Sequence, residues 1–164
     1  MGYTIDNENG IIKDTITGDR CIIITKARLQ QIFQRFTEIF QSGADLIIAE
    51  GMKASGERFA TEVPEEMKTD LSVFLTTAVQ RFTEAGLGKI EIVNFNPKTS
   101  ELKFRIWNNL FAEMHKEGGG TYCDAVANFV SGIYHQLTSE TPKVEKTKCI
   151  GKNDPYCEWN LTPE

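Results

Sequence analysis

The sequence lacks any apolar run that could span a membrane. Stretches such as residues 21–24 and 46–49 are far shorter than the roughly 20 apolar residues that a membrane-spanning helix needs. The first residues also lack the basic region and the apolar core of a secretory signal. We therefore expect a cytoplasmic protein without a membrane span, in which cysteines are more often thiols or metal ligands than disulfides.

The sequence also has no excess of basic residues. Lys and Arg total 18 against 23 Asp and Glu, which gives a net charge of −5 and an isoelectric point of about 5.2. A dedicated nucleic-acid-binding protein carries a basic surface, so no nucleic-acid partner is expected. The sequence also has no G-x-G-x-x-G fingerprint of nicotinamide binding, and a non-enzymatic role is therefore favoured over an enzymatic one.

The composition is that of an ordinary globular chain. Of the 164 residues, 40% are apolar and 25% are charged, and no internal repeat occurs. A chain of this length can bury a full core in one domain without a disulfide or a metal as an obligatory staple. The polar start predicts a flexible segment at residues 1–9, followed by a single domain at residues 10–164.

The spacing of apolar residues predicts hairpins that alternate with helices. Alternation around a central turn predicts β-hairpins at residues 10–25, 89–108 and 143–161. Apolar residues spaced three and four apart predict four helices. The first runs from a cap at Thr25 to Phe40, and the second covers residues 43–63 with breaks near Gly51 and Gly56. The third follows Thr69, and the last begins at Thr121, which forms a capping box with Asp124. Hairpins that form an antiparallel sheet with helices packed on it define an α+β fold.

The cysteines are the first candidate site. Cys149 and Cys157 lie symmetrically about the closing turn, where directly opposed strand residues have Cβ atoms about 4.5–5.5 Å apart. That separation suits two thiolates on one metal, with bonds of about 2.3 Å, and it also permits a disulfide. Cys123 falls in the first turn of the last predicted helix, where the thiolate is favoured. Spacing alone leaves metal ligands, a disulfide and buried free thiols open, and Cys21 is interpreted as a core residue.

A set of aromatic residues is the second candidate site. The functional interpretation is the wall of an apolar cavity for a flat or acyl ligand, and the structural alternative is ordinary core packing. Trp107 and Tyr134 each carry a polar group that could orient such a ligand. The candidate lining residues are Phe74, Phe82, Phe104, Trp107, Phe111, Phe129 and Tyr134.

Two segments of the sequence resemble the 4-vinyl reductase domain family. They are "CDAVANFVSG" and "VEKTKCIGKNDPYCEW", and the match in element order extends from about Gly18 to Leu161. The family pattern has a cysteine that opens the last helix, small residues after it, a closing cysteine hairpin with an aromatic end, and glycines in the second helix. The positions that carry this pattern are Cys123, Asn128, Gly132, Cys149, Gly151, Cys157, Trp159, Gly51 and Gly56.

The resemblance implies a fold and a binding site. The fold is shared with the sensory domains of aromatic-responsive bacterial regulators and with a subunit class of the vesicle-tethering TRAPP complex, a ligand-binding domain of the NO-signalling and Golgi-transport type. Such domains carry a buried apolar pocket and often form dimers through their first helices. The resemblance thus implies a small apolar ligand and a homodimer through the N-terminal helices, and residues 26–40 are apolar enough for both the core and a partner.

The resemblance also implies a metal. Sensor relatives hold zinc with cysteines that match Cys123, Cys149 and Cys157 and with a glutamate three residues before the second of them. Lys146 stands at that place here, and Glu145 lies one position earlier. A shift of one residue moves a strand side chain to the other face, so the fourth ligand is Glu145 across a bulge, a water, or nothing. Three thiolates favour zinc, with iron or an iron–sulfur cluster as the alternative.

Three classes of function follow from these features. The first is a domain that binds or senses a small hydrophobic molecule and carries a structural cysteine-ligated metal. The second is an accessory or reductase-like factor in tetrapyrrole metabolism, as the family name suggests. The third is a subunit that assembles through a dimer face.

Overall fold

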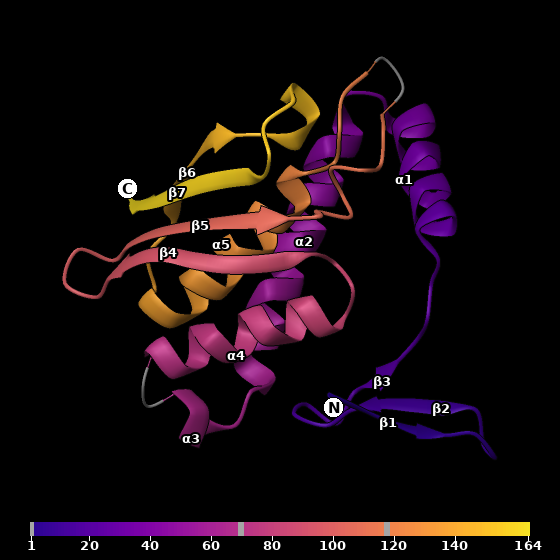
Figure 1. Cartoon of the computed structure of the whole chain (residues 1–164), viewed down its shortest axis with the longest axis horizontal. Helices are drawn as coiled ribbons and strands as arrows, with labels where there is room; N and C mark the ends of the chain where they lie inside the picture. The colour runs from indigo at the N-terminus through magenta and orange to yellow at the C-terminus, as the bar shows by residue number, and fades with distance from the viewer. Residues whose placement is uncertain (1, 69–70, 117–118) are drawn as a thin grey trace.

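The last two predicted hairpins form one antiparallel sheet, with strand order β4-β5-β7-β6. The computed structural model describes residues 2–68, 71–116 and 119–164. In the sheet, β5 pairs with β7 and joins the two hairpins, which are far apart in the sequence. Figure 1 shows α2 (Gly43–Glu62) and α5 (Asp124–Thr138) behind this sheet. Its strands are β4 (Lys89–Asn96), β5 (Glu101–Trp107), β6 (Pro142–Lys148) and β7 (Cys157–Pro163).

One face of this sheet is apolar because the side chains alternate. Leu102, Phe104 and Ile106 of β5 are buried, whereas Lys103 and Arg105 between them are partly exposed on the other face. Helix α5 (Asp124–Thr138) covers the apolar face and contributes to the same core cluster. The predicted α+β class, an antiparallel sheet with helices packed on it, is confirmed.

Helix α2 (Gly43–Glu62) packs against α5 at very close range. A Cβ atom added at Gly56 would lie 2.0 Å from the carbonyl oxygen of Phe129, and one added at Gly132 would lie 2.0 Å from that of Lys53. Glycine at both positions therefore lets the two backbones touch. The predicted breaks near Gly51 and Gly56 do not occur, because tertiary packing outweighs the weak helix preference of glycine.

The remaining helices lie around this pair. Helix α1 (Lys26–Phe40) begins as predicted at Thr25, whose hydroxyl accepts a hydrogen bond from the Arg28 amide. The short α3 (Glu65–Lys68) and then α4 (Leu71–Glu84) follow α2, and α4 packs beside β4. The predicted capping box of α5 is wrong: the helix begins at Asp124, with Cys123 as its N-cap and no side-chain cap bond. Among the described residues, no helix is long and apolar enough to cross a membrane.

The N-terminal residues form a small separate sheet. Its strands are β1 (Tyr3–Asp6), β2 (Ile11–Asp14) and β3 (Arg20–Cys21). Strand β1 lies in the segment 1–9, for which the sequence predicted no strand. The predicted hairpin at residues 10–25 is only partly formed, since β3 ends at Cys21 and an extended link leads on to α1 (Figure 1). Cys21 is half-exposed and not a core residue.

Candidate functional site

The structure brings three cysteines together at one end of α5. Cys123 caps the helix, and Cys149 and Cys157 flank the turn η1 (Ile150–Lys152) between β6 and β7. Their sulfur atoms all lie within 4.8 Å of one another, and all three residues are buried free thiols. The sulfur atoms of Cys123 and Cys149 are 3.6 Å apart. Among the described residues this is the group of metal-ligating side chains that could hold an ion.

A β-bulge sets the register of this group. Lys146 pairs with Trp159, but Lys148 pairs with Glu158, so Thr147 is an extra residue on β6. The next pair toward the turn is therefore Cys149 and Cys157. The Asp154 carboxylate accepts a hydrogen bond from the Cys149 amide at 2.8 Å, and the Ile150 amide donates to the Cys157 sulfur at 3.4 Å. These bonds hold the turn closed around the two sulfur atoms.

Glu145 does not join the cysteines. It pairs with Asn160 and is exposed, whereas Lys146 extends toward α5 because successive strand side chains point to opposite faces. The Lys146 ammonium donates to the Cys123 sulfur at 3.2 Å and to the Asp124 carboxylate at 2.7 Å. A cation thus stands at the position where the resemblance implied a fourth metal ligand.

The cysteine site has an uneven distribution of charge. A hydrogen bond between Cys157 and Cys123 lowers the pKa of the Cys123 thiol and raises that of the Cys157 thiol. Burial opposes the drop at Cys123, while the Thr121 hydroxyl and the Lys146 ammonium assist it. Burial alone would lower the pKa of Lys146, but its hydrogen bond to Asp124 and its contact with Cys123 raise it. Cys123 therefore ionises before Cys157.

The donor set fits a thiophilic metal. Tetrahedral zinc–thiolate bonds of about 2.3 Å place neighbouring sulfur atoms about 3.8 Å apart, close to the 3.6 Å between Cys123 and Cys149. Buried thiolates suit zinc or iron and not magnesium or calcium. Cys123, Cys149 and Cys157 could hold such an ion, which would tie the start of α5 to the closing hairpin.

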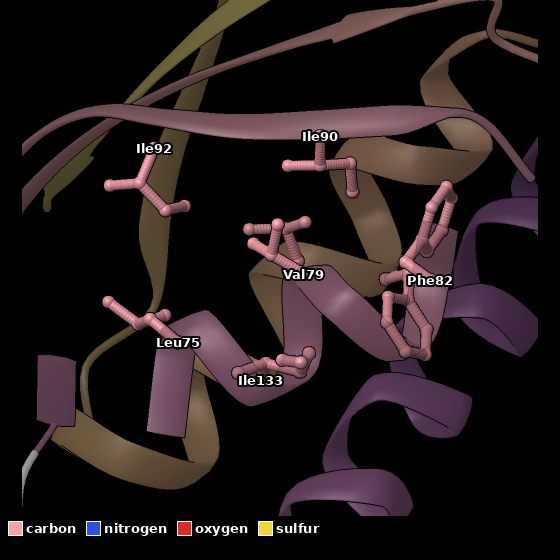
Figure 2. A pocket seen from close by; sticks show the side chains of 9 residues that line it. Leu75, Val79, Phe82, Ile90, Ile92 and Ile133 are labelled. Carbon is pink, nitrogen blue, oxygen red and sulfur yellow. The ribbon is translucent and has the colours of Figure 1, made fainter. Parts of the chain in front are cut away.

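A separate apolar cavity lies between α4, β4 and α5. Figure 2 shows Leu75, Val79 and Phe82 from α4 facing Ile90 and Ile92 from β4, with Ile133 from α5 below them. The cavity is small, with a volume of about 20 Å³. No polar surface lines it. The lining residues are Leu75, Ala78, Val79, Phe82, Ile90, Ile92, Phe129, Val130 and Ile133.

Two of the predicted lining residues, Phe82 and Phe129, face this cavity. Tyr134 lines a smaller cavity of about 10 Å³ nearby, and its hydroxyl hydrogen-bonds to the Glu140 carboxylate. Trp107 lies on the other face of the sheet, where the guanidinium of Arg105 approaches its ring. Neither the indole N–H of Trp107 nor the hydroxyl of Tyr134 therefore reaches the cavity between α4, β4 and α5.

Three other predicted aromatics pack elsewhere. Phe74 belongs to a second core cluster, Phe104 stacks on Trp159 with ring centres 5.2 Å apart, and Phe111 packs on Phe33. Most of the cavity wall is aliphatic. The prediction from the sequence considered only aromatic side chains and therefore missed most of the lining residues. The alternation of Ile90 and Ile92 on β4 and the spacing of Leu75, Val79 and Phe82 on one helix face could have identified it.

Comparison with protein-family models gives no match, and comparison with curated protein sequences gives no significant match. The fold, in contrast, has clear counterparts among solved structures. The phenol-responsive sensory domain of the transcription activator PoxR superposes with a TM-score of 0.81 at 16% identity, over 99% of this chain and 85% of that one.

Two further structures share the fold at lower similarity. A vinyl-4-reductase family protein of Methanocaldococcus jannaschii gives a TM-score of 0.54 at 15% identity, over 88% of this chain and 84% of that one. A trafficking protein particle complex subunit 3 of Naegleria fowleri, covalently bound to palmitic acid, gives 0.55 at 9% identity, over 85% of this chain and 97% of that one. The chain therefore has the fold that its resemblance to the 4-vinyl reductase domain family implies.

Proposed function

We propose that this chain is a binding or sensing domain for a small apolar molecule, with a structural metal at the three cysteines. The observation that carries the proposal is the cavity between α4, β4 and α5, which is lined by apolar atoms alone. Ligand sites of this kind are concave and mostly apolar. The sensory domain of PoxR, whose fold this chain shares, is described as phenol-responsive.

The walls of the cavity differ in how they are held. Helix α5 cannot move away from α2 freely, because Gly56 and Gly132 bring their backbones into contact. Helix α4 faces β4 and α5 through the side chains that line the cavity (Figure 2). At about 20 Å³ the cavity has room for little more than a water-sized sphere. A ligand with a ring would therefore displace α4 away from the sheet.

Movement of α4 would reach the N-terminal sheet through Arg81. This buried α4 residue forms an ion pair with Asp14 of β2 and donates a hydrogen bond to the Gly2 carbonyl. Its guanidinium also lies over the Tyr3 ring, 5.0 Å from the ring centre. The N-terminal sheet thus follows α4, and it is the element through which ligand binding would be passed on.

The metal would act as a structural crosslink. Held by Cys123, Cys149 and Cys157, it would fasten the start of α5 to the β6–β7 turn. A buried set of cysteine ligands is typical of structural zinc. Because α5 forms one wall of the cavity, the crosslink would fix that wall while α4 moves.

The lining predicts the chemical class of the ligand. A phenol hydroxyl buried without a hydrogen-bond partner costs about 1–3 kcal/mol, and the cavity offers no polar partner. The preferred ligand is therefore an apolar molecule such as toluene, and phenol should bind about tenfold more weakly or worse. Isothermal titration calorimetry with toluene and phenol tests this order, and equal or tighter binding of phenol would contradict it.

A pair of matched variants tests the site itself. Val79→Phe fills the cavity and should abolish the rise in Tm that toluene causes. Val144→Phe changes an exposed position on β6 and should keep that rise. If toluene does not raise the Tm of the native chain, or raises it equally in Val79→Phe, the cavity is not the binding site.

A second role, assembly as a homodimer, is favoured by one specific observation. Large apolar side chains are exposed along the link to α1 and at the α1–α2 corner: Ile22, Ile23, Ile39, Phe40 and Leu46. Large exposed apolar areas mark sites of protein–protein contact. We infer that a second copy covers this surface, in agreement with the dimer through N-terminal helices that the resemblance implies.

A further inference from the structure

We propose that a metal held by Cys123, Cys149 and Cys157 takes its fourth ligand from solution, as a small anion that enters through a cavity beside Cys149. The inference rests on the metal site of the proposed function and extends it by giving the metal an exchangeable fourth ligand. It is carried by three features of the site: the shortage of protein ligands, a cavity lined by Cys149, and the positive charge of two lysines that line the same cavity.

The protein supplies three ligands where tetrahedral zinc needs four. Within the described residues, no further His, Asp or Glu joins the cysteine group. The nearest carboxylates are held by other donors: Asp124 accepts from Trp159 at 3.2 Å and from Lys146 at 2.7 Å. Asp154 accepts from the Cys149 amide. The fourth position is therefore left to an external ligand.

A cavity reaches the site from the outside. Its volume is about 220 Å³, against about 20 Å³ for the apolar cavity by the same measure. A Cβ atom at Gly151 would lie 3.5 Å from the Cys149 sulfur and 2.9 Å from Thr121, so a larger side chain there would narrow the approach. The lining residues are Gly119, Gly120, Thr121, Lys146, Cys149, Gly151 and Lys152.

The charge of the cavity selects an anion. Lys146 and Lys152 both line it. Lys146 shares its charge with Asp124, whereas Lys152 is exposed and makes no ion pair with any described residue. A small anion that binds the metal would thus meet the Lys152 ammonium, which pairs with no carboxylate of the described residues. A neutral ligand such as water is attracted less strongly by the two lysines.

Cobalt(II), which absorbs visible light and accepts the same ligands as zinc, provides the test, with azide as the anion. The native chain should bind cobalt with thiolate-to-metal absorption, and azide should shift its ligand-field bands in a saturable way. Lys146→Glu places a carboxylate beside Cys123, and this variant should bind cobalt but lose the response to azide. Lys152→Gln should weaken azide binding about two- to fivefold, the range of an exposed charge pair.

Lys148→Gln is the matched control. Lys148 lies on the same strand, donates to the Tyr156 hydroxyl and does not line the cavity, so its replacement should leave azide binding unchanged. Cobalt binding without any spectral response to azide would overturn the inference and leave the metal site intact. An unchanged azide response in Lys146→Glu would also overturn it. Failure to bind cobalt at all would instead refute the metal site of the proposed function, and the inference with it.

Discussion

At the scale of single residues, two glycines in α2 have opposite roles. Gly56→Ala would force a Cβ atom to within 2.0 Å of the Phe129 carbonyl oxygen, whereas Gly51 has nothing within 4 Å of its added Cβ. The first change should lower the free energy of unfolding by about 1–3 kcal/mol or more. The second should raise it by about 0.5–1 kcal/mol, because alanine is the better helix former. Urea unfolding measures both, and a stabilised Gly56→Ala would contradict the close contact.

The cysteines allow a second prediction at this scale. Cys157→Ser removes one of three thiolates and should release the metal and lower the Tm. Cys21→Ser, at a half-exposed position in the N-terminal sheet, should change neither. Metal content per chain after purification without added metal measures the first effect. Equal metal content in both variants would show that the cysteine group is not the metal-binding site.

The cysteine site shows how far single residues could be predicted from the sequence. The sequence shows that Cys149 and Cys157 lie symmetrically about Asn153, and it placed Cys123 in the first turn of a helix that was predicted to begin at Thr121. That Lys146 contacts the Cys123 sulfur could not be predicted, because the contact depends on a bulge at Thr147 and on the docking of α5 against the hairpin. Bulges and docking arise from tertiary packing, which local spacing does not encode.

At the scale of elements, the contact between α4 and the N-terminal sheet is sensitive to acid. Burial alone would raise the pKa of Asp14, but hydrogen bonds from Arg81 and from the amides of Ile16 and Thr17 lower it below its usual value. A lowered carboxyl pKa stabilises the folded state above the unfolded pKa of about 3.9. That contribution is lost as the pH falls through the folded pKa.

Amide hydrogen exchange measures this acid sensitivity. In the native chain, exchange of the β2 amides, corrected for the intrinsic effect of pH, should rise as the pH falls below about 4. Asp14→Asn should show raised exchange already at neutral pH and no such acid step. The buried amides of α5, which lies outside the N-terminal sheet, are the internal reference. Protected β2 amides in Asp14→Asn at neutral pH would show that another contact holds the sheet.

The elements themselves were largely predictable because most of them repeat a local pattern. The cap at Thr25, the β4–β5 hairpin and the closing hairpin all follow from alternation and turn residues. The pairing of β5 with β7 has no local signal, since it joins residues more than 50 positions apart. The capping box at Thr121 failed for a related reason: the start of α5 is set by Cys123 and the turn that it contacts.

At the scale of the whole molecule, α1 has apolar residues on two sides. Leu29, Phe33 and Phe36 pack on the core, while Ile39 is 68% exposed at the end of the helix. Ile23, in the link before α1, is 81% exposed. Burial of such side chains against a second copy would stabilise a dimer by about 1.5–3 kcal/mol for each fully covered residue. The link that carries Ile23 follows directly after β3 of the N-terminal sheet, which Arg81 joins to α4.

The oligomeric state in solution tests this surface. The native chain should sediment as a dimer at micromolar concentration, and Ile39→Glu should sediment as a monomer, because a carboxylate buried in an apolar interface has no partner. Val144→Glu, at an exposed position on β6, should remain a dimer. Because Arg81 joins the N-terminal sheet to α4, toluene should also change the dissociation constant of the native dimer and leave that of Val79→Phe unchanged. A native chain that sediments as a monomer would refute both the interface and this coupling.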